Sequence, residues 1–220
     1  GRGVKVFAYE MPSNPDKEPW KLILVDESMH LTHNLDVVTG RDSDILYIGG
    51  KEGIKSFVFR GNRWSGQDPS GWTVQNRSFG ELRADATGNL IAGIEPMHGN
   101  QLTVYMRGKE KPASSSDDGT RFRTVLSSDL NQGHALAIAD LLPGNGKQLV
   151  VGWREPDKEG KVGVKLFVQG DDSKWQEYWI DNDGMACEDL QVADLNADGK
   201  PDIIAAGRAT KNLKIYWNGN

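Results

Sequence analysis

The chain has 220 residues, of which 37% are hydrophobic and 26% are charged, and its 26 glycines are typical of a globular protein rich in turns. Its net charge of −5, without a cluster of basic residues, argues against a nucleic-acid partner. The single cysteine, Cys187, excludes an internal disulfide, and no apolar run approaches the roughly 20 residues of a membrane span.

Short strand-like segments follow one another along the whole chain. VKVFAYE (4–10) and WKLILVD (20–26) come first and alternate apolar with polar residues, as strands do. A longer unit of strand, polar turn and apolar strand then occurs four times. Its copies are HNLDVVTGRDSDILYIGG (33–50), GELRADATGNLIAGIEP (80–96), HALAIADLLPGNGKQLVVGW (134–153) and EDLQVADLNADGKPDIIAAG (188–207).

A third strand follows every copy, and a fourth follows three of them, as GWTVQNR (71–77), RFRTVLSS (121–128) and KWQEYWID (174–181). Four strands in a period of about 50 residues are typical of propeller blades. We therefore predict an all-β fold, a β-propeller of four-stranded antiparallel blades with four to five blades' worth of sequence in one domain, 1–220. The predicted blades are 1–28 (partial), 29–78, 79–132, 133–184 and 185–220 (partial). Open strand edges at the partial blades predict a homo-oligomer.

Several motifs resemble known families. DLNADGKPDI resembles the calcium-binding turn of FG-GAP/VCBS-type repeats, which occur in secreted and cell-surface propellers. GIEPMHGNQLTVY, GHALAIADL, VGWREP and MACEDLQVADLNADGKPDI resemble the propeller domain of the fungal aldos-2-ulose dehydratase family and its bacterial relatives. The resemblance covers essentially the whole chain. It implies a seven-bladed parent ring, removal of water from an oxidised sugar, and a secreted or periplasmic location.

The turn after residue 193 has the residues of a calcium site. Asp194, Asn196, Asp198 and Asp202 offer the hard oxygen ligands that Ca²⁺ prefers, and Gly199 permits a sharp turn. Such an ion would clamp a blade turn, so we predict a structural calcium. The alternative is a solvated Asx-rich turn without an ion.

The placement of the histidines suggests chemistry at one end of the propeller. His33 and His134 precede first strands, Glu188 aligns with His134, and His98 follows a second strand. Because first strands line the central channel, these side chains should converge at one channel mouth. The interpretations are a zinc or other divalent metal site at His33, His98 and His134, or metal-free acid–base catalysis.

Other residues are predicted to share that mouth. Glu188 would act as ligand or base and Arg154 as an anion clamp, while Trp153, Glu95 and Arg208 would bind substrate. The alternatives are structural hydrogen bonds for each histidine, core packing for Trp153 and a surface ion pair for Arg208.

The predicted function is a sugar-directed lyase or dehydratase, which eliminates across a carbon–oxygen bond in a carbohydrate or uronic acid. The alternative is a non-catalytic secreted propeller that binds a glycan or a protein and uses calcium only structurally. The chain contains no Gly-x-Ser-x-Gly nucleophile motif and no phosphate-binding glycine loop, which disfavours serine hydrolase and nucleotide-dependent functions.

Overall fold

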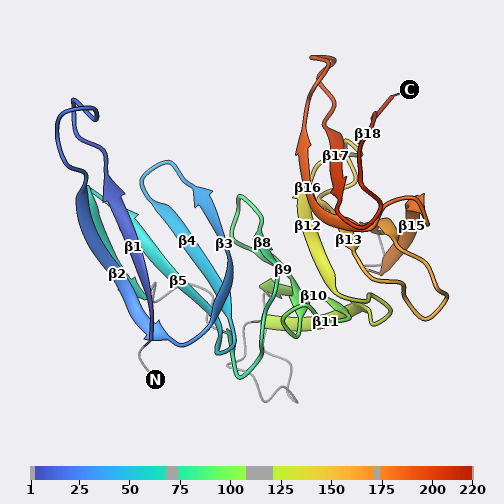
Figure 1. Ribbon diagram of the computed structural model, residues 1–220, viewed down its shortest axis with the longest axis horizontal. Helices are drawn as coiled ribbons and strands as arrows, with labels where there is room; N and C mark the ends of the chain where they lie inside the picture. Colours follow the sequence, from blue (N-terminus) through green and yellow to red (C-terminus); the bar gives the residue numbers. More distant parts are fainter. Residues whose placement is uncertain (1–2, 68–73, 108–120, 171–173, 220) are drawn as a thin grey trace.

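The computed structural model describes residues 3–67, 74–107, 121–170 and 174–219. Every regular element in these ranges is a β-strand (Figure 1). The described part of the chain therefore contains no helix with the length and hydropathy needed to cross a membrane.

The strands form successive antiparallel sheets in chain order. A two-stranded sheet, β1–β2, comes first. The next sheets have the strand orders β3-β4-β5-β6, with β7 also paired to β5, then β8-β9-β10-β11, β12-β13-β14-β15 and β16-β17-β18. The bounds are β1 Val4–Glu10, β2 Lys21–Met29, β3 Thr32–Thr39, β4 Asp44–Gly50, β5 Gly53–Arg60, β6 Arg63–Gln67, β7 Val74–Gln75, β8 Leu82–Ala84, β9 Leu90–Glu95, β10 Gln101–Arg107, β11 Arg121–Ser127, β12 Gly133–Ala139, β13 Gln148–Trp153, β14 Gly163–Gln169, β15 Trp175–Asn182, β16 Cys187–Ala193, β17 Asp202–Gly207 and β18 Asn212–Tyr216.

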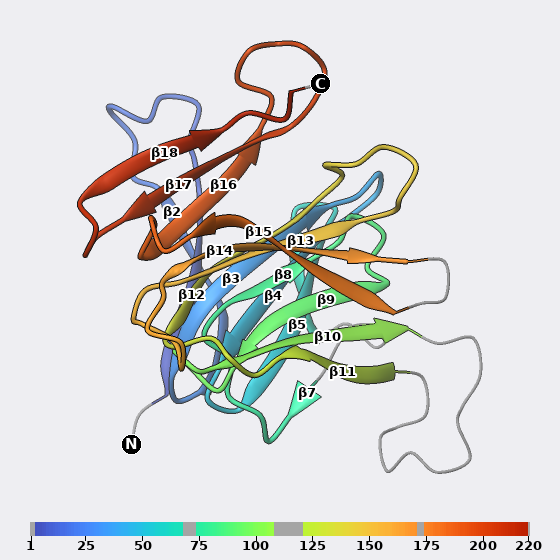
Figure 2. The ribbon, with the colours of Figure 1, turned by 90° about the vertical axis from the view of Figure 1, so that its right-hand side faces the viewer.

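The four larger sheets are arranged as propeller blades around a common axis (Figures 1 and 2). The first strand of each blade, β3, β8, β12 or β16, lies innermost. Together these strands line a groove of about 410 Å³. The predicted all-β propeller of antiparallel blades is confirmed. Among the described residues there are four blades, two with four strands, one with five and one with three, and the β1–β2 sheet lies next to the first.

The first blade differs from its sequence pattern. The predicted fourth strand at 71–77 is described only from residue 74, where β7 pairs with the start of β5. The other end of β5 pairs with β6, which the sequence analysis did not predict. Two short strands thus share the outer edge of this blade.

The core lies between the faces of neighbouring sheets. Leu102 and Val104 of β10 pack with Leu136, Leu149 and Trp153 of the next blade. A second cluster of buried apolar side chains lies between the sheets that begin with β12 and β16. A third lies between the sheets that begin with β3 and β8. The second strands β9 and β13 are buried along their whole length because sheets cover both of their faces.

The turn between first and second strands is built differently in different blades. Asp85 is buried, and its Oδ1 accepts the backbone N–H groups of Asn89 and Leu90 at 2.8 and 2.9 Å. Asp140, at the corresponding place in the next blade, is half exposed, and its Oδ2 lies 3.8 Å from Lys147 Nζ. One aspartate therefore holds its turn, whereas the other lies at the surface.

Replacing Asp85 by alanine should lower the free energy of unfolding by about 1–3 kcal/mol, because two turn N–H groups lose their acceptor. Asp140→Ala is the matched control and should change it by less than about 0.5 kcal/mol. Chemical denaturation of both variants measures the difference. Equal effects would show that Asp85 does not hold the turn.

Exposed apolar side chains lie on the sheets at both ends of the arc. On β1–β2 the cross-strand pairs Phe7–Leu24 and Tyr9–Leu22 are between 40% and 61% exposed. Leu213, Ile215 and Trp217 are exposed on or next to β18. Self-association through these end sheets stays a prediction. Sedimentation velocity should show a concentration-dependent oligomer, and a monomer at all concentrations would contradict it.

Candidate metal and acid–base site

The site is built from an irregularity repeated at the start of each first strand. In β3 the pairing register shifts between Thr32 and Asn34, which leaves His33 as an extra residue. His134 in β12 and Glu188 in β16 lie at the corresponding shifts. Such β-bulges re-aim a side chain without ending the strand.

The second blade has the same feature just before β8. The Gly80 N–H donates to the Ile94 carbonyl, and the Ile94 N–H donates to the Glu81 carbonyl. Gly80 and Glu81 together therefore lie opposite the single residue Ile94, as in a β-bulge. Leu82 then pairs with Gly93 in regular register. Glu81 therefore occupies the position of His33, His134 and Glu188. Glu81 does not stand out in the sequence when the repeats are aligned on Asp85, Asp140 and Asp194, because it is then two residues out of step with His134 and Glu188. Aligning Gly80 with Gly133 places Glu81 opposite His134.

His33 and His134, here called the bulge histidines, each donate a hydrogen bond to a backbone carbonyl of the following blade. The His33 Nδ1 lies 2.7 Å from the Gly80 carbonyl oxygen, and the His134 Nδ1 lies 2.7 Å from that of Glu188. Because a carbonyl only accepts hydrogen bonds, each Nδ1 carries the ring proton. When the ring is neutral, Nε2 is then the atom with the lone pair that can bind an ion or a proton.

The third histidine, His98, comes from the loop between β9 and β10. Its backbone has a φ of 52°, a left-handed conformation that is uncommon outside glycine. The Gly99 carbonyl accepts the Gly133 N–H at 2.9 Å, which ties the loop to the next blade. A Cβ on residue 80 would lie only 2.8 Å from the backbone nitrogen of His98. Glycine is therefore required at position 80 for the His98 loop to come this close.

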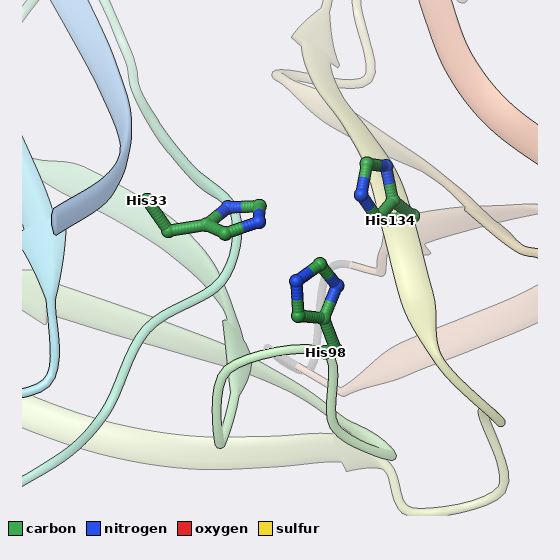
Figure 3. A group of neighbouring side chains, drawn as sticks. All are labelled: His33, His98 and His134. Atoms are coloured by element: carbon green, nitrogen blue, oxygen red, sulfur yellow. The ribbon is translucent and has the colours of Figure 1, made fainter. Parts of the chain in front are cut away.

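These three residues form the histidine cluster, His33, His98 and His134 (Figure 3). Their ring centroids are 4.4 Å apart for His33–His98, 5.1 Å for His98–His134 and 5.7 Å for His33–His134. One ligand nitrogen from each ring lies within 4.8 Å of the others. In the described ranges, no other set of three or more His, Cys, Asp or Glu side chains has the spacing to hold a metal ion.

The cluster lies beside opposite charges. The Arg154 Nη1 lies 3.0 Å from Glu188 Oε1, and the exposed Arg208 has its Nε 3.8 Å from Glu188 Oε2. Arg154 also contacts His98, with 3.5 Å between Nη2 and Nδ1. Burial, followed by the charges of His33 and His134, lowers the pKa of His98 and favours its neutral form.

Two predicted substrate-binding residues lie in packed surroundings. The Glu95 carboxylate is buried and accepts hydrogen bonds from Tyr105, Thr103 and Arg123. Trp153 is 1% exposed, and its indole N–H donates to the Lys161 carbonyl. None of the contacts found among the described residues joins either side chain to the cluster. Glu188, Arg154 and Arg208 are the predicted residues that the fold does bring beside it.

The fourth histidine stays outside the cluster. His30 is exposed, and its Nδ1 pairs with Glu52 Oε1 at 3.0 Å. It lies three residues from His33 but before β3 begins.

The acidic turn folds around its own backbone. Asp194 accepts the N–H groups of Asp198 and Gly199, and Gly199 has the expected left-handed φ, 84°. Asp202 is buried and accepts N–H groups from Leu195 and Asn218. Asn196 and Asp198 are exposed, and the Asn196 side-chain amide donates a hydrogen bond to the Asp198 carboxylate. The calcium site therefore stays a prediction.

If the turn binds calcium, millimolar Ca²⁺ should raise the thermal unfolding temperature, because an ion bound only to the folded state stabilises it by about 2.7 kcal/mol at 100 times its Kd. Asp198→Ala should remove the shift. Asp16→Ala, at an exposed carboxylate elsewhere in the chain, is the control and should keep it. No shift in the unmodified protein would leave an Asx-rich turn without an ion.

No protein-family model matches the chain, and a search of curated proteins found no match either.

Proposed function

We propose that the histidine cluster binds zinc or another divalent transition metal, and that the protein is a carbon–oxygen lyase acting on a sugar or uronic acid. The observation that carries the proposal is the convergence of three imidazoles from three successive blades, with ligand atoms within 4.8 Å of one another. Because the residues are far apart in sequence, this grouping exists only in the folded protein.

The donor set suits such an ion. His33 and His134 offer unprotonated Nε2 atoms, and the lowered pKa of His98 favours the neutral imidazole that a metal needs. Three histidine ligands that leave a fourth position open are the pattern of catalytic zinc sites.

The same residues can support elimination. A bound ion supplies Lewis-acid polarisation of a substrate carbonyl. If the three imidazoles hold an ion, the Glu188 carboxylate would take the proton from the carbon next to that carbonyl; without an ion, a neutral imidazole of the cluster would take it. The electron pair of the broken C–H bond forms the C=C bond as the C–O bond on the neighbouring carbon breaks. The protonated base returns its proton to the departing oxygen, which leaves as water or an alcohol. Arg208, which is 73% exposed on its side chain, is available to bind a substrate carboxylate.

An axial groove lies farther along the same first strands. Its volume of about 410 Å³ is that of a small-molecule site, and residues such as Asp36, Arg83 and Leu136 line it, whereas none of the three histidines does. The resemblance of the motifs to FG-GAP/VCBS repeats and to aldos-2-ulose dehydratase adds the reaction type and a secreted or periplasmic location. Propeller architecture alone does not choose among functions.

Elemental mass spectrometry on protein purified without chelators should find close to one transition-metal ion per chain. His134→Ala should lose the metal because one of three ligands is removed. His30→Ala is the matched control, since His30 lies outside the cluster, and it should retain the metal. Calcium alone, unchanged by either substitution, would contradict the metal site.

Ultraviolet absorbance of an unsaturated product then tests the reaction on a panel of oxidised sugars and uronic acids. The unmodified protein and His30→Ala should produce it, and His134→Ala should not. A protein that binds metal and glycans without eliminating would instead be a non-catalytic binding propeller.

A further inference from the structure

We infer that Glu81 is a positioning residue that orients His33 and fixes its tautomer from outside the cluster, an inference that rests on the proposed role of His33 as ligand or base. The sequence does not single out Glu81. Its assignment comes from the four equivalent bulge positions, which carry His33, Glu81, His134 and Glu188 in chain order.

The Glu81 carboxylate is turned toward the proton-bearing side of the His33 ring. Its Oε1 lies 3.7 Å from His33 Nδ1, the atom that donates to the Gly80 carbonyl. Gly80 and Glu81 are the two residues of the same β-bulge. This one bulge therefore supplies both the carbonyl that accepts the His33 hydrogen bond and the carboxylate beside it. Both favour a proton on Nδ1 and a lone pair on Nε2.

Other contacts hold the carboxylate in this position. Its side chain is 4% exposed, and Oε2 accepts a hydrogen bond from Asn34 Nδ2. The Arg83 Nη1 lies 3.7 Å from Oε2 and donates at 3.2 Å to Asn34 Oδ1. A buried carboxylate with this support keeps one orientation, which a residue that orients another requires.

The corresponding carboxylate in the fourth blade is arranged differently. The backbone carbonyl of Glu188 accepts from His134, but its side chain pairs with Arg154 at 3.0 Å. Its charge is thereby directed to a cation and not to the imidazole. The two bulge histidines are therefore unequal: a carboxylate oxygen lies 3.7 Å from His33 Nδ1, whereas the carboxylate at the bulge next to His134 pairs with an arginine.

The test measures Zn²⁺ and Co²⁺ affinity for the unmodified protein, Glu81→Gln and Glu81→Asp. Removing a carboxylate that orients a metal-ligating histidine typically weakens affinity 10–100-fold, so Glu81→Gln should fall by about that factor. Glu81→Asp keeps the charge and should recover part of the loss. The visible spectrum of the Co²⁺ form should change in Glu81→Gln because the geometry of the His33 ligand changes.

Glu52→Gln is the matched control. Glu52 also pairs with a histidine, His30, at 3.0 Å, but outside the cluster. It should leave metal affinity and the Co²⁺ spectrum unchanged. A tenfold loss in this variant as well would mean that any lost carboxylate weakens binding, and would overturn the inference.

A second readout needs no metal. Nitrogen-15 NMR of the metal-free protein should show His33 with its proton on Nδ1, and Glu81→Gln should lower the population of that tautomer. If the unmodified protein binds neither metal, the proposed metal site fails while this measurement still tests Glu81. An unchanged tautomer and unchanged metal affinity in Glu81→Gln would overturn the inference, and Glu81→Asp provides the same comparison if the glutamine variant does not fold.

Discussion

Apolar packing between the faces of successive sheets is the constraint on which the rest of the molecule depends. Second strands such as β9 and β13 are covered on both faces, so each blade is fixed by its neighbours. That packing places four first strands around one axis. Without it, His33 and His134, about 100 residues apart in the chain, would have no reason to meet.

Bulges turn this regular scaffold into a site. A regular strand would direct successive side chains alternately to the two faces of its sheet. The extra residue at each first strand breaks this alternation and directs His33 and His134 to the axis. The same bulges present backbone carbonyls to the imidazoles of the preceding blade. Main-chain geometry thus supplies a hydrogen-bond acceptor for each ring, and at His33 the Glu81 carboxylate lies beside the same Nδ1 atom.

The two carboxylates at the bulge positions, Glu81 and Glu188, have different partners. Glu188 is paired with Arg154, while Glu81 is buried beside His33 with a neutral amide as its hydrogen-bond partner. Burial raises the pKa of Glu81, and the Asn34 amide and Arg83 oppose that rise. The site therefore combines one carboxylate that is paired with a cation and one that is hydrogen-bonded to a neutral amide. Such inequality between similar groups is what acid–base chemistry uses.

The all-β propeller can be predicted from the amino-acid pattern, because strand period, turn residues and the repeat of about 50 residues are local features. The same pattern indicates His33, His134 and Glu188, which occupy one place in the repeat, and His98, which follows a second strand. The folded arrangement was needed to show that Glu81 shares that place and that Glu95 and Trp153 are held in packed surroundings. One reason is that a β-bulge adds a residue without changing the composition of the strand. The other is that the direction of a side chain depends on contacts between blades, and no single repeat contains both partners of such a contact.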